Sequence, residues 1–173
     1  PADIPSVVDA DSARNFLDWN VCSGPDNAKG KDAGCSVTYK YGMKRDFTNW
    51  LALLGDAAPL KSLTALRAWN DAHRSAGALK YGQSNLDNAD ETDVLADRSR
   101  YEADRRKDLF LTASHGIDEV MKAQRLDALI FPAQSGAGIA ARAAYPTVIV
   151  PFATVANTPM PVFPAGFDPQ AAP

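Results

Sequence analysis

Apolar residues recur at helical spacing in the first two thirds of the chain. Phe47, Trp50, Leu51 and Leu54 fall at positions i, i+3, i+4 and i+7, which places four large apolar side chains on one face of a helix. Gly55 follows them and is expected to end that helix. The pattern predicts an amphipathic helix whose apolar face is buried.

A second helix is predicted after Ser62, whose hydroxyl can cap a helix N-terminus. Its shared face would hold Leu63, Leu66, Trp69 and Asn70, and Gly77 would stop it. His73 would lie near the C-terminal end, where a histidine commonly does no more than favour the helix dipole.

Residues 93–124 carry dense charges of both signs and predict a long solvent-facing helix, bent or broken at Gly116. Its second half has an apolar stripe made of Leu109, Ala113, Ile117, Val120 and Met121. The charges between Glu91 and Asp108 are expected to form a solvated surface with pairs four residues apart, such as Glu102 with Arg106. His115 would lie at the edge of the apolar stripe without a catalytic role.

The period changes after this helix. Residues 128–131 and 147–150 are short, nearly all apolar, and bounded by prolines at 132, 146 and 151. Such runs are typical of strands buried on both faces of a sheet. Two strands cannot form a stable sheet alone, so partners are expected from a longer chain or another molecule. The predicted fold class is therefore α/β, with a helix-rich part and two strands of a larger mixed sheet covered by helices. Without those partners, an exposed apolar surface or self-association is expected.

These patterns divide the chain, as a single partial domain, into four parts. A loop-rich segment covers residues 1–36, a helical region 37–125, a strand–loop–strand unit 126–152 and a proline-rich tail 153–173. The chain begins without methionine and stops inside the proline-rich stretch, and we interpret it as an excerpt of a longer protein.

Composition excludes several classes of protein. With 46% hydrophobic and 23% charged residues, the 173-residue chain has the composition of a soluble globular protein. A net charge of -3 with interleaved basic residues argues against a nucleic-acid partner. No apolar run approaches the roughly 20 residues that span a bilayer, so no membrane partner is expected.

Cys22 and Cys35 flank a loop rich in Gly, Asp, Lys and Asn. A disulfide between them would close this loop and imply an oxidising compartment, extracellular or periplasmic. The alternative is two unpaired thiols in a cytoplasmic protein. A metal site is a third and weaker reading, because structural zinc takes four Cys or His ligands and the only histidines, His73 and His115, lie in separate helical patterns.

The segment between the two predicted strands is the best candidate for a pocket. Residues 136–141 read G-x-G-x-x-A, as in a dinucleotide-binding turn. Pro146 limits any helix to about two turns, however, and no carboxylate follows until Asp168, so no nucleotide or other cofactor is expected. Small and polar residues after a buried strand are instead suited to binding a substrate. The candidate substrate-binding residues are Gln134, Ser135, Gly136 and Gly138, with a simple turn as the alternative.

A search for catalytic groups is negative. No serine has a lysine three residues later, no two serines are adjacent, and Ser135 lacks the leading glycine of a nucleophile elbow. We therefore assign no catalytic residue and no metal ligand.

Residues 39–161 resemble the amidase signature family in several successive places. The phrases are residues 58–63 (APLKSL), residues 69–70 (WN), residues 79–83 (LKYGQ) and residues 126–151. Each is weak alone, but their order and spacing make the resemblance fairly specific. The chain departs from the family at Ala144, where glycine before Tyr-Pro is more usual, and in the loop from Cys22 to Cys35.

The resemblance implies hydrolysis of a carboxylic amide to an acid and ammonia or an amine, through a serine nucleophile, a second serine in a cis peptide and a lysine base. None of the three matches a residue of this chain. The expected partners are a small amide substrate and the remaining part of an amidase chain, and these 173 residues alone are expected to be inactive. The alternative is a non-catalytic helical binding domain that presents residues 134–144 to a partner.

Overall fold

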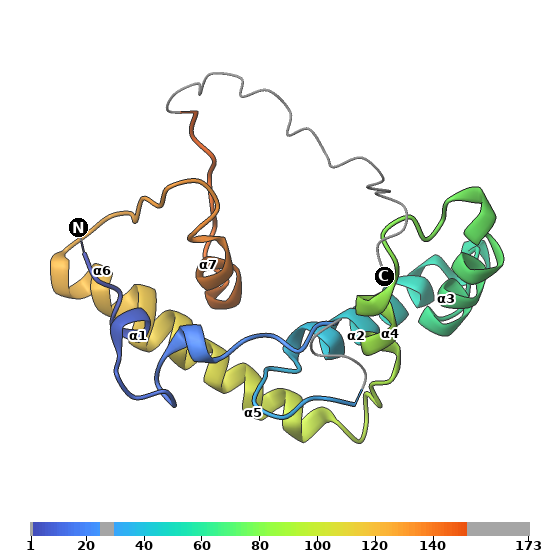
Figure 1. Ribbon diagram of the computed structural model, residues 1–173, viewed down its shortest axis with the longest axis horizontal. Helices are drawn as coiled ribbons and strands as arrows, with labels where there is room; N and C mark the ends of the chain where they lie inside the picture. The colour runs from blue at the N-terminus through green and yellow to red at the C-terminus, as the bar shows by residue number, and fades with distance from the viewer. Residues whose placement is uncertain (1, 25–29, 152–173) are drawn as a thin grey trace, which may run out of the picture.

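The computed structural model describes residues 2–24 and 30–151, and these residues are 56% helical with no β-strand or sheet (Figure 1). The α-helices are α1 (Pro5–Val8), α2 (Thr38–Leu54), α3 (Leu63–Ala72), α4 (Ser84–Asp90), α5 (Arg98–Leu109), α6 (Asp118–Gln124) and α7 (Ala137–Ala143). Short 3₁₀ turns are η1 (Phe16–Asp18), η2 (Gly55–Ala57) and η3 (Arg74–Ala76), and η4 (Phe110–Ile117) is π-helical.

Helices α5, η4 and α6 follow one another as a single long rod, which forms the spine of the molecule (Figure 1). The predicted irregularity at Gly116 is present, because this residue has φ -123° and ψ -110°, outside the helical region. A Cβ atom at this position would lie 2.7 Å from the carbonyl oxygen of Leu111. The spine therefore bends at a place where only glycine fits without rearrangement.

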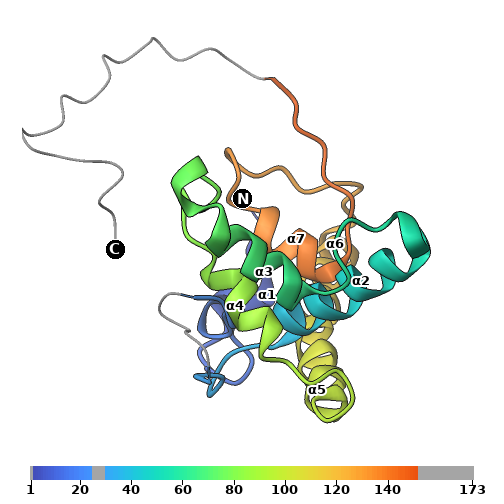
Figure 2. The same cartoon turned by 90° about the vertical axis from the view of Figure 1, so that its right-hand side faces the viewer.

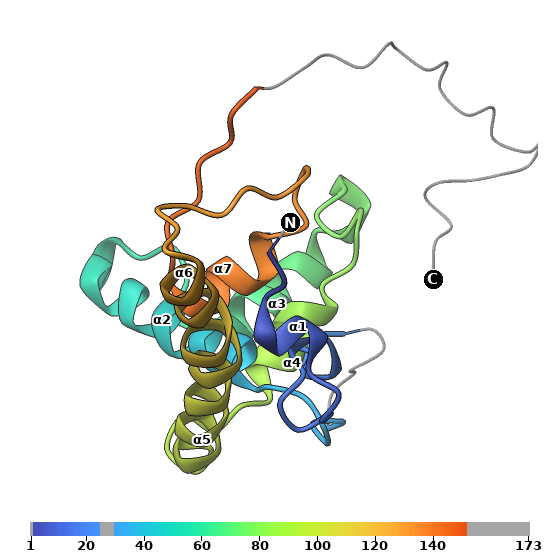
Figure 3. The same cartoon turned by 90° about the vertical axis from the view of Figure 1, so that its left-hand side faces the viewer.

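Two apolar clusters lie along the spine. The first packs α1, the end of η4, α6 and α7 together, and its buried members are Ile4, Ile117, Val120, Ile139, Ala140 and Ala143. Figure 3 shows α1 and α7 beside this part of the rod. The second consists of Cys22, Cys35 and Val37, covered by Tyr101 of α5. Helices α2, α3 and α4 pack on one another beyond the second cluster (Figure 2).

Local capping sets the ends of two helices where the sequence predicts them. The Ser62 hydroxyl accepts a hydrogen bond of 3.0 Å from the backbone N–H of Ala65, so α3 begins at Leu63. Gly55 follows α2 with φ 54°, a left-handed value that favours glycine. Both ends follow from local chemistry alone.

The expected burial of the α2 face is only partly realised. Leu51 is 5% exposed, but Trp50 is 51% exposed and Leu53, which the helical pattern did not include, is 86% exposed. The inward side of α2 instead carries Lys40 and Tyr41, which are both buried. Periodicity identified the helix but not the side that faces the core.

The predicted α/β fold with two buried strands is wrong for the described residues. Residues 128–131 and 147–150 have no strand structure, and Ile130 and Ile149 are 98% and 95% exposed. The one isolated β-bridge in the described part of the chain joins Val21 to Ser36. Strand formation depends on hydrogen-bonding and packing neighbours, and no second strand lies beside either run.

The prediction of a solvated charged surface on α5 also needs correction. Asp104 and Asp108 are buried, and Glu102 pairs with Arg98 at 2.8 Å rather than with Arg106. The proline-rich tail at 153–173 lies outside the described residues. Within the described part of the chain, no helix combines the length and the apolar character needed to cross a bilayer.

Candidate functional site

The four candidate substrate-binding residues lie together in the turn that leads into α7. The Ser135 hydroxyl donates a hydrogen bond of 2.8 Å to the carbonyl oxygen of Pro132, and both Gln134 and Ser135 are exposed. Gly136 is buried. A Cβ atom at this position would lie 2.3 Å from the Phe131 ring, so there is no room for a side chain. The second glycine is freer, with the nearest side-chain atom 3.9 Å away in Phe16. Gly136 thus permits close packing against Phe131, and Gln134 and Ser135 are exposed to solvent.

This turn can contact a ligand but has no means to break a bond. The Ser135 hydroxyl is engaged within its own turn, and no base contacts it among the described residues. Nucleophilic catalysis needs a hydroxyl activated by a base and donors aimed at a developing oxyanion. Among the described residues, the surroundings of Gln134 and Ser135 therefore allow polar contact with a ligand and supply no activating base.

A buried carboxylate on the spine joins three distant segments. Asp108 is 1% exposed and accepts hydrogen bonds from the Trp19 indole (2.9 Å), the Ser36 hydroxyl (2.9 Å) and the Thr38 hydroxyl (2.7 Å). The Arg142 guanidinium of α7 lies 3.6 Å from the same carboxylate, and burial lowers the pKa of this arginine. Because every carboxylate oxygen is paired, Asp108 holds the fold together and is not free for chemistry.

His115 lies between two carboxylates. Its Nε2 is 2.8 Å from Asp9 Oδ2, and its Nδ1 is 2.9 Å from Glu119 Oε2. The Arg14 guanidinium also lies beside this ring, with its Nη2 3.3 Å from Nε2 and 3.5 Å from Nδ1. Both ring nitrogens are thus already in contact with partners from the protein. His115 therefore links the loop that follows α1 to the spine rather than acting as a base.

The Asp9 carboxylate is strongly stabilised in its charged form. The backbone N–H of Asp11 donates to it at 2.9 Å, and the Arg14 guanidinium does so at the same distance. These hydrogen bonds, together with that from His115, lower the pKa of Asp9 from 3.8 to about 2. The second histidine, His73, lies with Nδ1 2.8 Å from the carbonyl oxygen of Trp69 at the end of α3.

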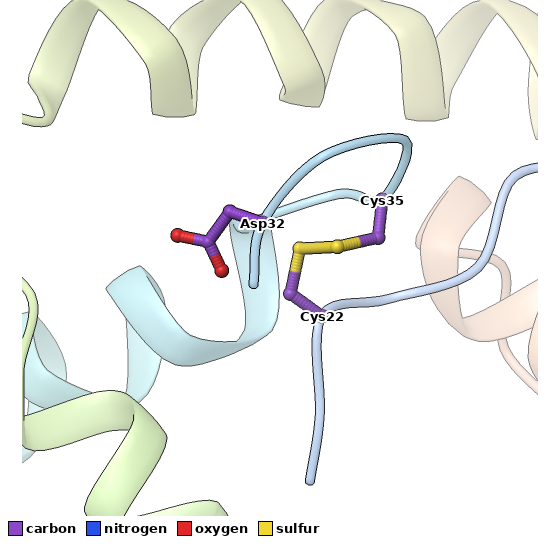
Figure 4. Close-up of side chains that lie close together, drawn as sticks. All are labelled: Cys22, Asp32 and Cys35. Atoms are coloured by element: carbon purple, nitrogen blue, oxygen red, sulfur yellow. A yellow bond between two sulfur atoms is a disulfide. The ribbon is translucent and has the colours of Figure 1, made fainter. Parts of the chain in front are cut away.

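Cys22 and Cys35 form a disulfide, with 5.2 Å between their Cα atoms (Figure 4). The Asp32 carboxylate lies near the two sulfurs, and the three side chains together have the composition of a metal site. The sulfur atoms are bonded to each other, however, and the Asp32 carboxylate is paired with Lys40 at 2.9 Å. The thiolates that a metal needs are thus absent in the oxidised chain.

Comparison with protein-family models, curated proteins and solved structures finds no match to this chain.

The contacts that organise the polar centres were not foreseen from the sequence. The His115 and Glu119 pair has the i,i+4 spacing of a helix surface and could have been predicted from it. The contact with Asp9 joins residues 106 positions apart, and that between Trp19 and Asp108 joins residues 89 apart. Local sequence patterns do not predict contacts between residues so far apart in the chain. Because many charged residues surround Asp108 in the sequence, the pattern predicted that it would be exposed on the surface.

Proposed function

We propose that this chain is a non-catalytic portion of an amidase, an enzyme that hydrolyses a carboxylic amide to an acid and ammonia or an amine. The ordered resemblance of residues 39–161 to the amidase signature family carries the proposal. In this proposal the serine and lysine groups that break the amide bond come from another part of the same enzyme. The turn at residues 134–138 would contribute polar contacts to the amide substrate.

Two structural observations support the proposal that this chain contacts the substrate while another part of the enzyme breaks the amide bond. The polar centres at Asp108 and His115 are saturated with partners, which leaves neither available as a catalytic base. The apolar run ending at Val150 is exposed, with Val148 84% and Val150 74% accessible. An exposed apolar run of this kind is stabilised when another part of a protein covers it.

The test uses the enzyme in the cells that express this sequence. Antibodies against the chain would isolate the native polypeptide, which would then be treated with a fluorophosphonate that modifies activated serines. We expect a modified serine on a peptide outside these 173 residues, in a polypeptide that also contains them, and release of ammonia from amide substrates. The isolated chain should show neither. Modification or turnover by the pure chain, or an unreactive native polypeptide, would refute the proposal.

A second candidate is a helical binding domain without an enzymatic partner. One observation favours it: the outer face of α2 has a hollow of about 480 Å³ lined mainly by apolar and aromatic side chains, with one carboxylate, Asp46. The lining residues are Tyr39, Gly42, Met43, Asp46, Phe47 and Trp50. Recovery of a native polypeptide that carries this chain, has no reactive serine and co-purifies with a stoichiometric partner bound at this face would favour this candidate.

A further inference from the structure

A second cavity, of about 310 Å³, lies between the start of α2, the disulfide loop and the start of α5. Its wall contains two cations and two anions together with a hydroxyl and two apolar side chains. The lining residues are Asp32, Val37, Lys40, Tyr41, Thr92, Asp97 and Arg100. The wall of the cavity is therefore polar and carries charges of both signs.

Thr92 is the unusual member of this wall. It is 3% exposed, and its hydroxyl has no hydrogen-bond partner among the residues that the structure describes. A buried hydroxyl without a partner is destabilising, and most such groups in native proteins are paired with protein or water. An unpaired hydroxyl on the wall of a cavity is explained when a bound molecule supplies the partner.

Part of the charge on the wall is already used. The Lys40 ammonium is 4% exposed and donates to both Asp32 oxygens, at 2.9 and 3.1 Å, and to Glu91. Its three protons are thereby engaged, so neither Lys40 nor Asp32 is the main attraction for a further ligand. Both hold the shape and charge balance of the cavity.

Arg100 and Asp97 differ from this saturated pair. The Arg100 Nε donates to Asp104 at 2.8 Å, and Nη2 donates to the carbonyl oxygens of Asp32 and Cys35. Its Nη1 has no partner among the described residues. The Asp97 Oδ2 accepts from the backbone N–H of Asp93 at 2.8 Å, whereas Oδ1 has no partner there. The two opposite charges line one cavity without pairing with each other.

We propose that this cavity binds a small zwitterion, a molecule with one ammonium and one carboxylate group, such as a free amino acid. The carboxylate would accept from Arg100 Nη1 and the Thr92 hydroxyl, and the ammonium would donate to Asp97 Oδ1. The Arg100 charge is already paired with Asp104, but its Nη1 still lacks an acceptor. A simple anion would leave Asp97 Oδ1 without a donor, and a simple cation would offer no acceptor to Arg100 Nη1 or the Thr92 hydroxyl. Tyr41 and Val37 supply an apolar wall for the carbon chain. The proposal does not depend on the amidase function.

The test is titration of the oxidised 173-residue chain by calorimetry and by thermal unfolding. The probes are glycine, β-alanine and 4-aminobutanoate, which separate the two charges by increasing distances, and acetate, methylammonium and acetamide serve as controls. We expect saturable binding of at least one zwitterion, at least tenfold tighter than any control, with a rise in Tm. Absence of saturation by every zwitterion, or equal binding of acetate or methylammonium, would overturn the proposal.

Two variants distinguish a ligand site from a water-filled space. Thr92→Val keeps the shape and removes the hydroxyl, while Asp97→Asn keeps an oxygen for the Asp93 N–H and removes the charge. Each should weaken zwitterion binding at least tenfold, and Thr92→Val should not lower the Tm of the unliganded chain. Asp56→Asn, on the exposed η2 turn, is the matched control and should bind as the wild type does. Unchanged binding in both site variants, or a lower unliganded Tm in Thr92→Val, would contradict the proposal.

Discussion

The disulfide between Cys22 and Cys35 is expected to be a major contribution to the stability of this chain. The two cysteines are 13 positions apart, and both are almost fully buried. In the chain-entropy model, closing a loop of this size stabilises the folded state by about 3 kcal/mol, because the bridge restricts the unfolded chain. For a chain of this length, that corresponds to a fall in Tm of roughly 6–12 °C on reduction.

Reduction is expected to leave the native contacts around the loop in place. The backbone N–H of Cys22 donates to the carbonyl oxygen of Ser36 at 2.7 Å, and Arg100 donates to the carbonyl oxygen of Cys35 at 3.0 Å. Neither contact requires the sulfur bond. The loss of stability on reduction should therefore arise mainly from the unfolded state, which becomes less compact when the disulfide is opened.

The assay is urea unfolding followed by tryptophan fluorescence, with and without a phosphine reductant. Reduction should lower the free energy of unfolding by about 3 kcal/mol and raise the m-value, since the reduced unfolded chain exposes more surface. The Cys22→Ala/Cys35→Ala double variant is the control, and its unfolding should not respond to reductant. A loss below about 1 kcal/mol with an unchanged m-value would refute the reasoning, because loop closure could then not be the source of stability.

Three further predictions test the packing and the polar centres. Asp108→Ala should lower the free energy of urea unfolding by about 3–5 kcal/mol, because it leaves buried donors unpaired. Glu102→Ala, on the exposed side of α5, should lower it by about 0.5 kcal/mol or less. Similar losses in the two variants would refute the burial argument. Gly136→Ala should cost about 1–3 kcal/mol because its methyl group meets an aromatic ring, while Gly138→Ala should be neutral or stabilise α7 by up to about 1 kcal/mol. The pKa of Asp9 is about 2 in the folded chain against an ordinary value of 3.8, so the stability that the Asp9 carboxylate contributes should be complete above pH 3.8 and lost as the pH falls through 2. Plotted against pH, the free energies of unfolding of the wild type and of Asp9→Asn should therefore converge as the pH falls over this range. A difference between them that does not change with pH would count against this prediction.

Several local features of the structure were predictable from the sequence. The start of α3 after Ser62 and the end of α2 before Gly55 depend on groups within a few residues of one another. The bend at Gly116 is likewise local, because it reflects the absence of a side chain opposite the carbonyl of Leu111. These interactions act along the chain, and the sequence displays them directly.

The strand prediction failed for a different reason. Residues 128–131 and 147–150 have the composition of buried strands, but composition states only what a segment would do beside suitable neighbours. In the described chain those neighbours are absent, and the apolar side chains are exposed. The exposed apolar surface itself was expected from the same argument, since two strands cannot stabilise a sheet alone.

The sequence by itself therefore determined the start of α3, the end of α2, the irregularity at Gly116 and the pairing available to the only two cysteines, because these depend on spacing and short-range geometry. Tertiary structure alone decided that Asp108 is buried while Trp50 is exposed, and that His115 meets Asp9. It also assembled the polar cavity around Thr92 from two stretches of the chain, residues 32–41 and 92–100. Burial and long-range pairing depend on which surfaces meet in space, and no periodicity within one helix contains that information.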